Sequence, residues 1–124
     1  MDIRAQVEAL VAGVQKGRSL DVFEEYYADN VVMNWNGVDD RVGKAANREF
    51  REFFAHNVQF HTIAAESVLV DGDKAVIEWV YDVSSAGGPR VHRKHVIVQT
   101  WESGKIVRQN FYVPGPLWPV HGAR

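Results

Sequence analysis

The sequence predicts an α+β domain in which helices from the first half of the chain lie on one face of an antiparallel sheet. Three turn signals lie in the second half, at residues 71–73, 84–89 and 102–105. They separate long runs rich in Val, Ile and aromatic residues, a pattern typical of an antiparallel meander. The first half has helical periodicity instead. A curved sheet covered by helices on one face commonly leaves an apolar hollow, so we expect a small-molecule pocket.

Size and composition narrow the function classes. The 124 residues predict a single domain over 1–124. A formal charge of −2 gives no general attraction to nucleic acid or anionic lipid. The absence of cysteine excludes disulfides, thiolate chemistry and Cys-based zinc sites. Residues 1–14 lack the apolar core of a signal peptide, and no run is long enough to cross a bilayer, so we expect a cytoplasmic protein.

Two helices are predicted near the start of the chain. Apolar side chains recur at helical spacing over about 3–16, and Gly17 suits the end of that helix. Ser19 is positioned to cap a second helix. The apolar stripe of the first helix consists of Ile3, Val7, Leu10, Val11 and Val14, and the second has Leu20, Phe23 and Tyr27 on one face.

A short strand, a third helix and four long strands are expected next. Val31, Met33 and Trp35 alternate with polar or smaller residues, and a turn or loop follows at 36–40. A helix is predicted over 44–56, with Glu49, Glu52, Arg48 and Arg51 on its exposed face and Ala46, Phe50, Phe53 and Phe54 on its apolar face. Strands are expected at 58–70, 74–83, 90–101 and 105–112. The Pro-rich tail, 113–124, cannot continue a sheet ladder.

This order of elements resembles the nuclear transport factor 2-like superfamily, which includes SnoaL-like polyketide cyclases, ketosteroid isomerases and limonene epoxide hydrolases. The likeness is carried by residues 23–32, 43–54 and the segment from Gly104 onward. The resemblance implies a cone-like α+β barrel whose strongly curved sheet encloses a pocket against the three helices. It also implies a homodimer formed through the outer face of the sheet.

The catalytic residues of these three families are not all present at the corresponding positions of this sequence. The proton-transfer positions of ketosteroid isomerases fall on Val11, Trp35 and Ile97. None of these side chains can exchange a proton, which argues against steroid-type isomerisation. The Arg and Asp positions of limonene epoxide hydrolases fall on Val80 and Phe111, with only Asp82 near an acid position. Of the Asp and His used by the cyclases, a histidine remains, and it falls on His95.

The candidate pocket therefore combines aromatic walls with a few polar groups, as ligand sites commonly do. Its expected lining is Trp35, Phe50, Phe54, Trp79, Tyr81, His95, Ile97, Gln99, Gln109 and Phe111. The alternative is that the aromatic residues are simply core. Inward-facing acids could come from Glu66, Glu78 or Asp82.

The histidines do not form a metal site in this pattern. His92 and His95 are three residues apart, so on a regular strand they face opposite sides. His61 and His95 could meet across strands, or each could simply be a surface or hydrogen-bonded histidine. We expect no metal and no cofactor.

Three functional readings remain open. The leading one is a SnoaL-like protein that binds a small hydrophobic, cyclic molecule and acts as an isomerase, cyclase or hydratase, with His95 or Tyr81 assisting proton transfer. The second is a non-catalytic ligand-binding module, and the third a dimeric assembly domain whose pocket is filled by its own aromatic side chains. We expect neither nucleic acid nor a membrane as a partner.

Overall fold

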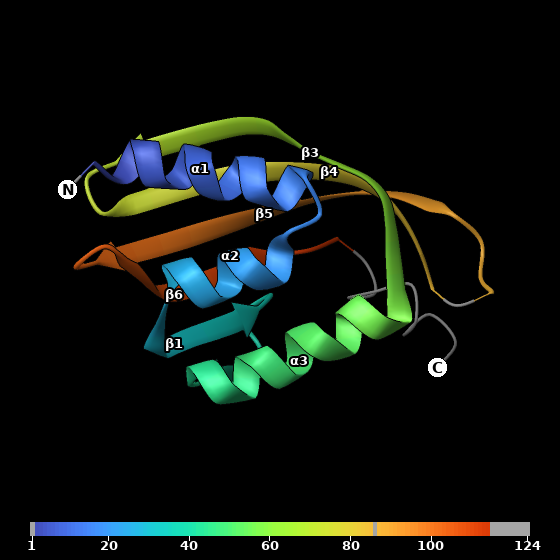
Figure 1. Ribbon diagram of the computed structural model, residues 1–124, viewed down its shortest axis with the longest axis horizontal. Helices are drawn as coiled ribbons and strands as arrows, with labels where there is room; N and C mark the ends of the chain where they lie inside the picture. Colours follow the sequence, from blue (N-terminus) through green and yellow to red (C-terminus); the bar gives the residue numbers. More distant parts are fainter. Residues whose placement is uncertain (1, 86, 115–124) are drawn as a thin grey trace.

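The computed structural model describes residues 2–85 and 87–114. These residues form three helices and a six-stranded sheet (Figure 1). The elements are α1 (Ile3–Gln15), α2 (Ser19–Tyr26), β1 (Tyr27–Trp35), β2 (Asp40–Val42), α3 (Lys44–Asn57), β3 (Val58–Asp71), β4 (Lys74–Ser85), β5 (Val91–Glu102) and β6 (Lys105–Tyr112).

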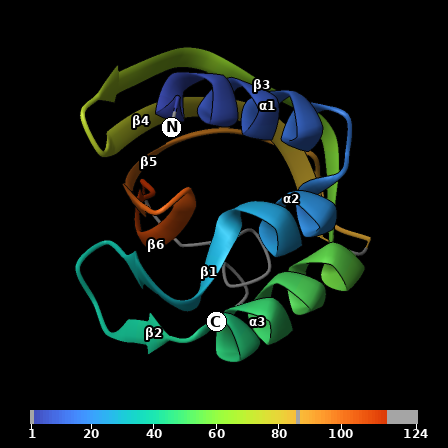
Figure 2. The same cartoon turned by 60° about the vertical axis from the view of Figure 1, so that its left-hand side comes forward.

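The strand order is β2-β1-β6-β5-β4-β3. All neighbours run antiparallel except β1 and β6, which are parallel. The meander β3-β4-β5-β6 was predicted from the three turn signals and is confirmed. Because the sheet bends without closing, it forms an open cone whose hollow side faces the three helices (Figure 2). The α+β class and the placement of the helices are therefore confirmed.

Two irregularities help β3 to bend. Its pairing with β4 shifts register between Phe60 and Thr62 and again between Ala65 and Ser67. Such bulges bend a strand and leave one residue without a partner in the ladder, here His61 and Glu66. At the second bulge the amide of Ala65 donates to Oε1 of Gln15, 2.9 Å away at the end of α1. One side chain of the first helix thus contacts the sheet at the point where the sheet bends.

The predicted alternation of buried and outward-facing side chains along β4 is confirmed. Ala75, Ile77, Trp79, Tyr81 and Val83 are all buried. They face the helices because successive side chains on a strand point to opposite faces.

The boundary between α2 and β1 differs from the prediction. Ser19 is the first residue of α2, and the cap position is Arg18, which makes no side-chain capping bond. Tyr27 is not part of the helix. Its backbone is extended, at φ −102° and ψ 135°, and it pairs with Ile106 of β6. Sheet pairing therefore overrides the helical spacing at this residue.

The predicted apolar face of α3 is also partly wrong. Phe54 is buried, but Phe53 is 51% exposed and Ala46 is exposed. The inward face instead includes Asn47, whose Nδ2 donates to the carbonyl oxygens of Arg41 and Gly43. These bonds fix the rotation of the helix, so the predicted face lies one position away from the real one. β2, which supplies one of these carbonyls, was not predicted, because its three residues have no apolar alternation.

No helix in the described part of the chain is long and apolar enough to cross a membrane.

The packing of α1 against α2 gives a test of the fold. A Cβ added at Gly13 would lie 2.6 Å from Cγ2 of Val22, which is buried. We expect Gly13→Ala to lower the free energy of unfolding by about 1–2 kcal/mol, because this overlap outweighs the roughly 1 kcal/mol gained in helix propensity. Urea unfolding measures the change.

As a control, Gly13→Ala is also made in the Val22→Ala variant, which lacks the opposing methyl groups. In that background Gly13→Ala should be neutral or stabilising. Equal destabilisation in both backgrounds would show that this contact does not hold the two helices apart.

Candidate functional site

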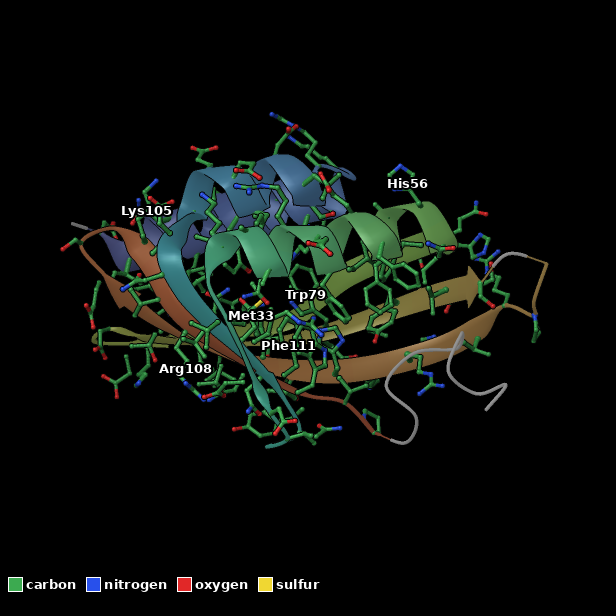
Figure 3. All side chains as sticks on the ribbon, turned by 90° about the horizontal axis from the view of Figure 1, so that it is seen from below. Met33, His56, Trp79, Lys105, Arg108 and Phe111 are labelled. Carbon is green, nitrogen blue, oxygen red and sulfur yellow. The ribbon has the colours of Figure 1, made fainter. Side chains whose placement is uncertain are left out.

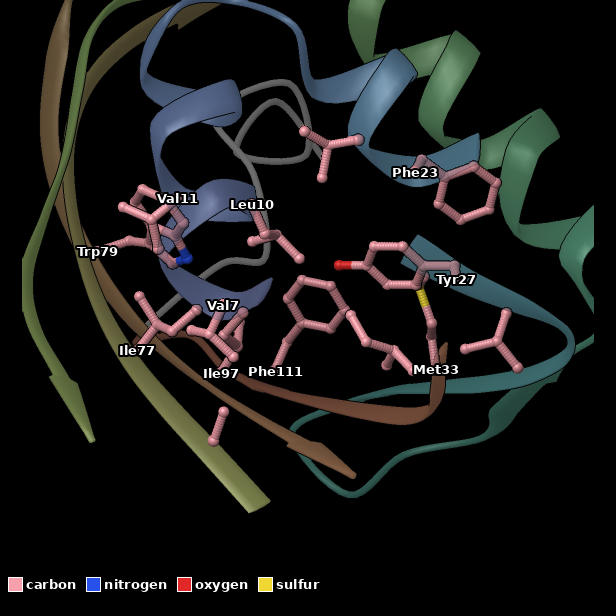
Figure 4. Close-up of a cluster of buried hydrophobic side chains, with 14 of the residues drawn as sticks. Val7, Leu10, Val11, Phe23, Tyr27, Met33, Ile77, Trp79, Ile97 and Phe111 are labelled. Carbon is pink, nitrogen blue, oxygen red and sulfur yellow. The ribbon is translucent and has the colours of Figure 1, made fainter. Parts of the chain in front are cut away.

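A cavity of about 450 Å³ lies between the helices and the hollow face of the sheet. Side chains of all three helices or their flanking turns and of β1, β3, β4, β5 and β6 border it. Leu10, Tyr27 and Phe111 converge from α1, β1 and β6, with the Tyr27 hydroxyl pointing toward Leu10 (Figure 4). Trp79 and Phe111 lie in the interior, whereas His56, Lys105 and Arg108 lie at the periphery (Figure 3). The size falls within the usual range for small-molecule sites.

Most of the residues expected to line a pocket border this cavity. They are Trp35, Phe50, Phe54, Trp79, His95, Ile97, Gln109 and Phe111. Tyr81 and Gln99 are buried one layer behind, where they hydrogen-bond His95 and Gln109 respectively. Neither residue is among those that border the cavity, and each is hydrogen-bonded to one that does.

One wall is a set of aromatic rings in defined contact. Trp35 stacks on Phe111 with centroids 4.2 Å apart and planes 2° apart. Phe50 meets Trp35 edge-on at 4.8 Å and Phe54 at 4.6 Å. Such contacts add to area burial and restrict ring rotation. The rings fix one another in place and leave open space beside them, rather than filling the hollow.

His95 and Tyr81 form a buried neutral pair. Nδ1 of His95 lies 2.9 Å from the Tyr81 hydroxyl, and His95 is only 9% exposed. Burial lowers the pKa of His95 to about 4, with a further contribution from the positive charge of Arg51. Burial raises the pKa of Tyr81 to about 12, against the opposing effect of Arg93. Both groups are therefore uncharged near neutral pH, and Nε2 is the imidazole nitrogen left for a ligand.

A chain of hydrogen bonds fixes the orientation of Gln109. The indole Nε1 of Trp101 donates to Oε1 of Gln99 at 3.1 Å, and Nε2 of Gln99 donates to Oε1 of Gln109 at 2.9 Å. The Tyr27 hydroxyl donates to the same Oε1 at 2.6 Å. An indole N–H can only donate, so the Gln99 oxygen must face Trp101. The Gln99 NH₂ group then faces Gln109, and the Gln109 oxygen is the atom that accepts from it. The Gln109 oxygen accepts two bonds, and its NH₂ group remains as a donor beside the cavity.

Arg51 also borders the cavity, although the sequence places it on the exposed face of α3. Its Nη2 lies 3.4 Å from the Tyr27 hydroxyl oxygen, and its guanidinium carbon is 5.2 Å from the ring centres of both Phe23 and Tyr27. Tyr27 and Arg51 were not predicted to border the cavity, nor were Gln15, Ser19 and Thr62. The strand alternation does not extend back to Tyr27, because Asp29 is exposed and the pairing with β6 shifts register between Tyr27 and Val32. Arg51 lies four residues after the buried Asn47, a spacing that puts both on one face of the helix.

The strand acids lie outside the cavity. Glu66 pairs with Lys94, Glu78 accepts from Ser67, and Asp82 contacts His92 and Arg90. The hydrogen bond from His92 holds the pKa of the Asp82 carboxyl below its usual value. None of the three predicted acids is therefore an inward group.

The histidines have separate partners. Nε2 of His61 lies 2.9 Å from the Ser84 hydroxyl, so His61 and His95 border the same cavity but bond different residues. Within residues 2–85 and 87–114, no three His, Asp or Glu side chains are grouped so that they could hold a metal ion.

Comparison with known proteins places this fold in a family. A model of the SnoaL-like domain matches residues 7–109. The chain belongs to the SnoaL-like domain family. A search of curated proteins gave no match to this SnoaL-like domain.

Solved structures support the fold. A protein assigned as a SnoaL-like polyketide cyclase from Mesorhizobium loti is 26% identical, with a TM-score of 0.81 over 90% of this chain and 99% of that one. A protein assigned as a polyketide cyclase from Pseudomonas putida is 18% identical, with a TM-score of 0.73 over 94% and 93% of the two chains. An LEH-like epoxide hydrolase from M. tuberculosis is 19% identical, with a TM-score of 0.71 over 88% of this chain and 80% of that one.

The buried imidazole gives the stability of the SnoaL-like domain a pH dependence. His95 has a pKa of about 4 when folded and about 6.5 when unfolded, so between these values only the unfolded chain takes up the proton. Stability should therefore fall as the pH is lowered from 7 to 4. The contribution of His95 to this fall is on the order of 2–3 kcal/mol. Urea unfolding across this range should show a shallower dependence for His95→Gln.

His56→Gln is the control, because it removes an exposed histidine at the end of α3. It should follow the wild-type curve. A wild-type slope retained in His95→Gln would contradict the assignment of a neutral buried imidazole.

Proposed function

We propose that this SnoaL-like domain is an enzyme that binds a small cyclic, largely apolar molecule in the cavity and moves a proton on it through His95. The observation that carries the proposal is the His95–Tyr81 pair: a neutral imidazole, almost fully buried, at the edge of an aromatic cavity. The names of the relatives point in the same direction, since they include cyclases and an isomerase. An isomerase, cyclase or hydratase reaction fits this site.

The chemistry follows from the state of the imidazole. In the tautomer whose Nδ1–H donates to the Tyr81 hydroxyl oxygen, Nε2 carries no proton and can take one from an acidic C–H of the bound molecule. The electron pair of that C–H bond passes to an adjacent carbonyl as an enolate, and the imidazolium returns the proton to another atom. The low pKa makes His95 a weak base in the empty cavity. The enolate charge formed beside it raises its basicity during the step.

The walls supply the binding. Trp35, Phe50 and Phe111 present rigid aromatic surfaces, which favour a flat or cyclic apolar partner. Trp35, Ile97 and Phe111 border the cavity at positions where the resemblance places acid–base groups of isomerases and hydrolases. Proton transfer by those routes is not open to this chain, and of the two histidines that border the cavity, His95 is the buried one and His61 is only partly buried.

A substrate is first identified by screening cyclic ketones and esters. The proposed proton transfer is then tested with the variants His95→Ala and Tyr81→Phe. We expect His95→Ala to reduce kcat by about 10²–10⁴-fold, the usual contribution of a positioned acid–base group. Tyr81→Phe should have a smaller effect, because that hydroxyl only orients the ring. Product formation is followed by mass spectrometry, with His92→Ala as the control on the outer face of the same strand. Unchanged turnover in both variants would rule out this mechanism.

A second candidate is a binding module without catalysis. The observation that favours it is that no carboxylate of the described residues borders the cavity. Under this reading a ligand raises the Tm and is recovered unchanged. A chemically altered ligand after incubation excludes it.

A homodimer formed through the outer face of the sheet stays part of the proposal, as does a cytoplasmic location. The outer face supports the dimer, because Leu69 is 63% exposed and Tyr112 is 48% exposed beside the partly buried Val76, Val96 and Val98. An apolar area of this kind marks interaction sites in many proteins.

The dimer is tested by Tyr112→Glu, which would place a charge within the proposed interface. We expect light scattering to give a dimer for the wild type at micromolar concentration and a monomer for the variant, since burying an unpaired charge is costly. Val38→Glu, an exposed change in the β1–β2 turn, should remain dimeric. A wild-type monomer at that concentration would remove the dimer from the proposal.

A further inference from the structure

The polar groups around the cavity carry charge of only one sign. Arg51 is the charged side chain of the lining, and His61 and His95 are its titratable bases. Among the residues that the structure describes, no Asp or Glu borders the cavity. Because the rest of the wall is mostly apolar, this charge is not offset from within the site.

Arg51 has unused hydrogen-bonding capacity. Arg48, one turn earlier on α3, is paired with Glu24, and Arg108 is paired with Asp40. Arg51 has no carboxylate within 4 Å among the described residues, and its hydrogen bond to the Tyr27 hydroxyl is long, at 3.4 Å. A guanidinium has five N–H donors in a planar fork that matches a carboxylate. The aromatic rings of Phe23 and Tyr27 hold the group but cannot accept those donors strongly.

The second donor lies close by. Gln109 and Arg51 both contact the same Tyr27 oxygen, so their side chains converge at one end of the cavity. The Gln109 oxygen is occupied by Tyr27 and Gln99, and its NH₂ is therefore the part free to meet a ligand. The Tyr27 proton is already given to Gln109. This end of the cavity thus offers donors and lacks a free carboxylate acceptor.

We infer that the ligand of this SnoaL-like domain is a ring-containing carboxylate, whose carboxylate is held by Arg51 and the Gln109 NH₂ while its ring lies against Trp35 and Phe111. This inference rests on the proposed function, since it assigns the substrate class of the same cavity. Charge-assisted bonds from a guanidinium to a carboxylate are about twice as strong as neutral ones. An amine would meet Arg51 with like charge and find no acceptor to replace its water.

The anchor and the reactive group then occupy different parts of one cavity. The carboxylate end is set by α3 and β6, and His95 reaches the ring from β5, with its ring centre 6.1 Å from that of Phe111. Anchoring one end of a substrate fixes the position of the other, which is what a proton transfer to a single nitrogen requires.

The test uses three probes with one ring system and different head groups: 2-naphthoate, 2-naphthamide and 2-naphthylmethylammonium. Isothermal titration calorimetry on the full chain should give naphthoate an affinity about tenfold or more above that of naphthamide, with the ammonium weakest. Arg51→Gln should remove most of the advantage of naphthoate and leave naphthamide within about twofold. Arg48→Gln is the matched control on the same helix and should retain the wild-type order.

The possible results separate the two proposals. If naphthoate and naphthamide bind the wild type equally, the carboxylate inference is wrong and the aromatic pocket stands. If none of the three probes binds, the pocket proposal itself is overturned, and this inference with it. If the preference for naphthoate survives in Arg51→Gln but is lost in Arg48→Gln, the anchor has been assigned to the wrong arginine. The wild-type series decides the ligand class even if Arg51→Gln fails to fold.

Discussion

The parallel pairing of β1 with β6 is the constraint on which the rest of the site depends. Among the residues that the structure describes, it is the one parallel pairing in a sheet that is otherwise antiparallel. The pairing places Trp35 opposite Phe111 and Met33 opposite Gln109. The helical half of the chain is thereby attached to the meander, and the two aromatic rings stack. In another register Trp35 would not lie beside Phe111, and the aromatic wall would not lie next to Gln109.

Two buried amide side chains determine where the cavity offers a hydrogen-bond donor. Gln99 and Gln109 are almost fully buried, and burying an amide costs free energy unless it is hydrogen-bonded. The chain from the Trp101 indole to the Tyr27 hydroxyl satisfies both oxygens and one NH₂. A network with one unmet donor, facing the cavity, is expected at a binding site more than in a purely structural core.

The sequence was sufficient for the fold and for most of the cavity walls, and the reasons differ by element. In β4 the alternation of apolar and polar residues matches the pleat, so the inward positions of Trp79 and Tyr81 could be predicted. Tyr27 could not, because helical spacing and strand pairing compete at that residue and a partner 79 positions away, Ile106, decides the outcome. Arg51 was missed because a charged residue beside other charged residues is indistinguishable in sequence from a solvated face. Its position depends on the rotation of α3, which Asn47 sets through bonds to backbone carbonyls.

The bulge between Ala65 and Ser67 bears on how such cavities diversify. β3 is an edge strand, and Gln15 of α1 accepts a hydrogen bond from the Ala65 amide beside the bulge, so α1 contacts the sheet where the register of β3 shifts. An insertion or deletion of one residue in β3 would move or remove the bulge without altering a single wall residue on β5 or β6. Such a change would alter the β3 side of the cavity while His95 on β5 and Gln109 on β6 keep their places.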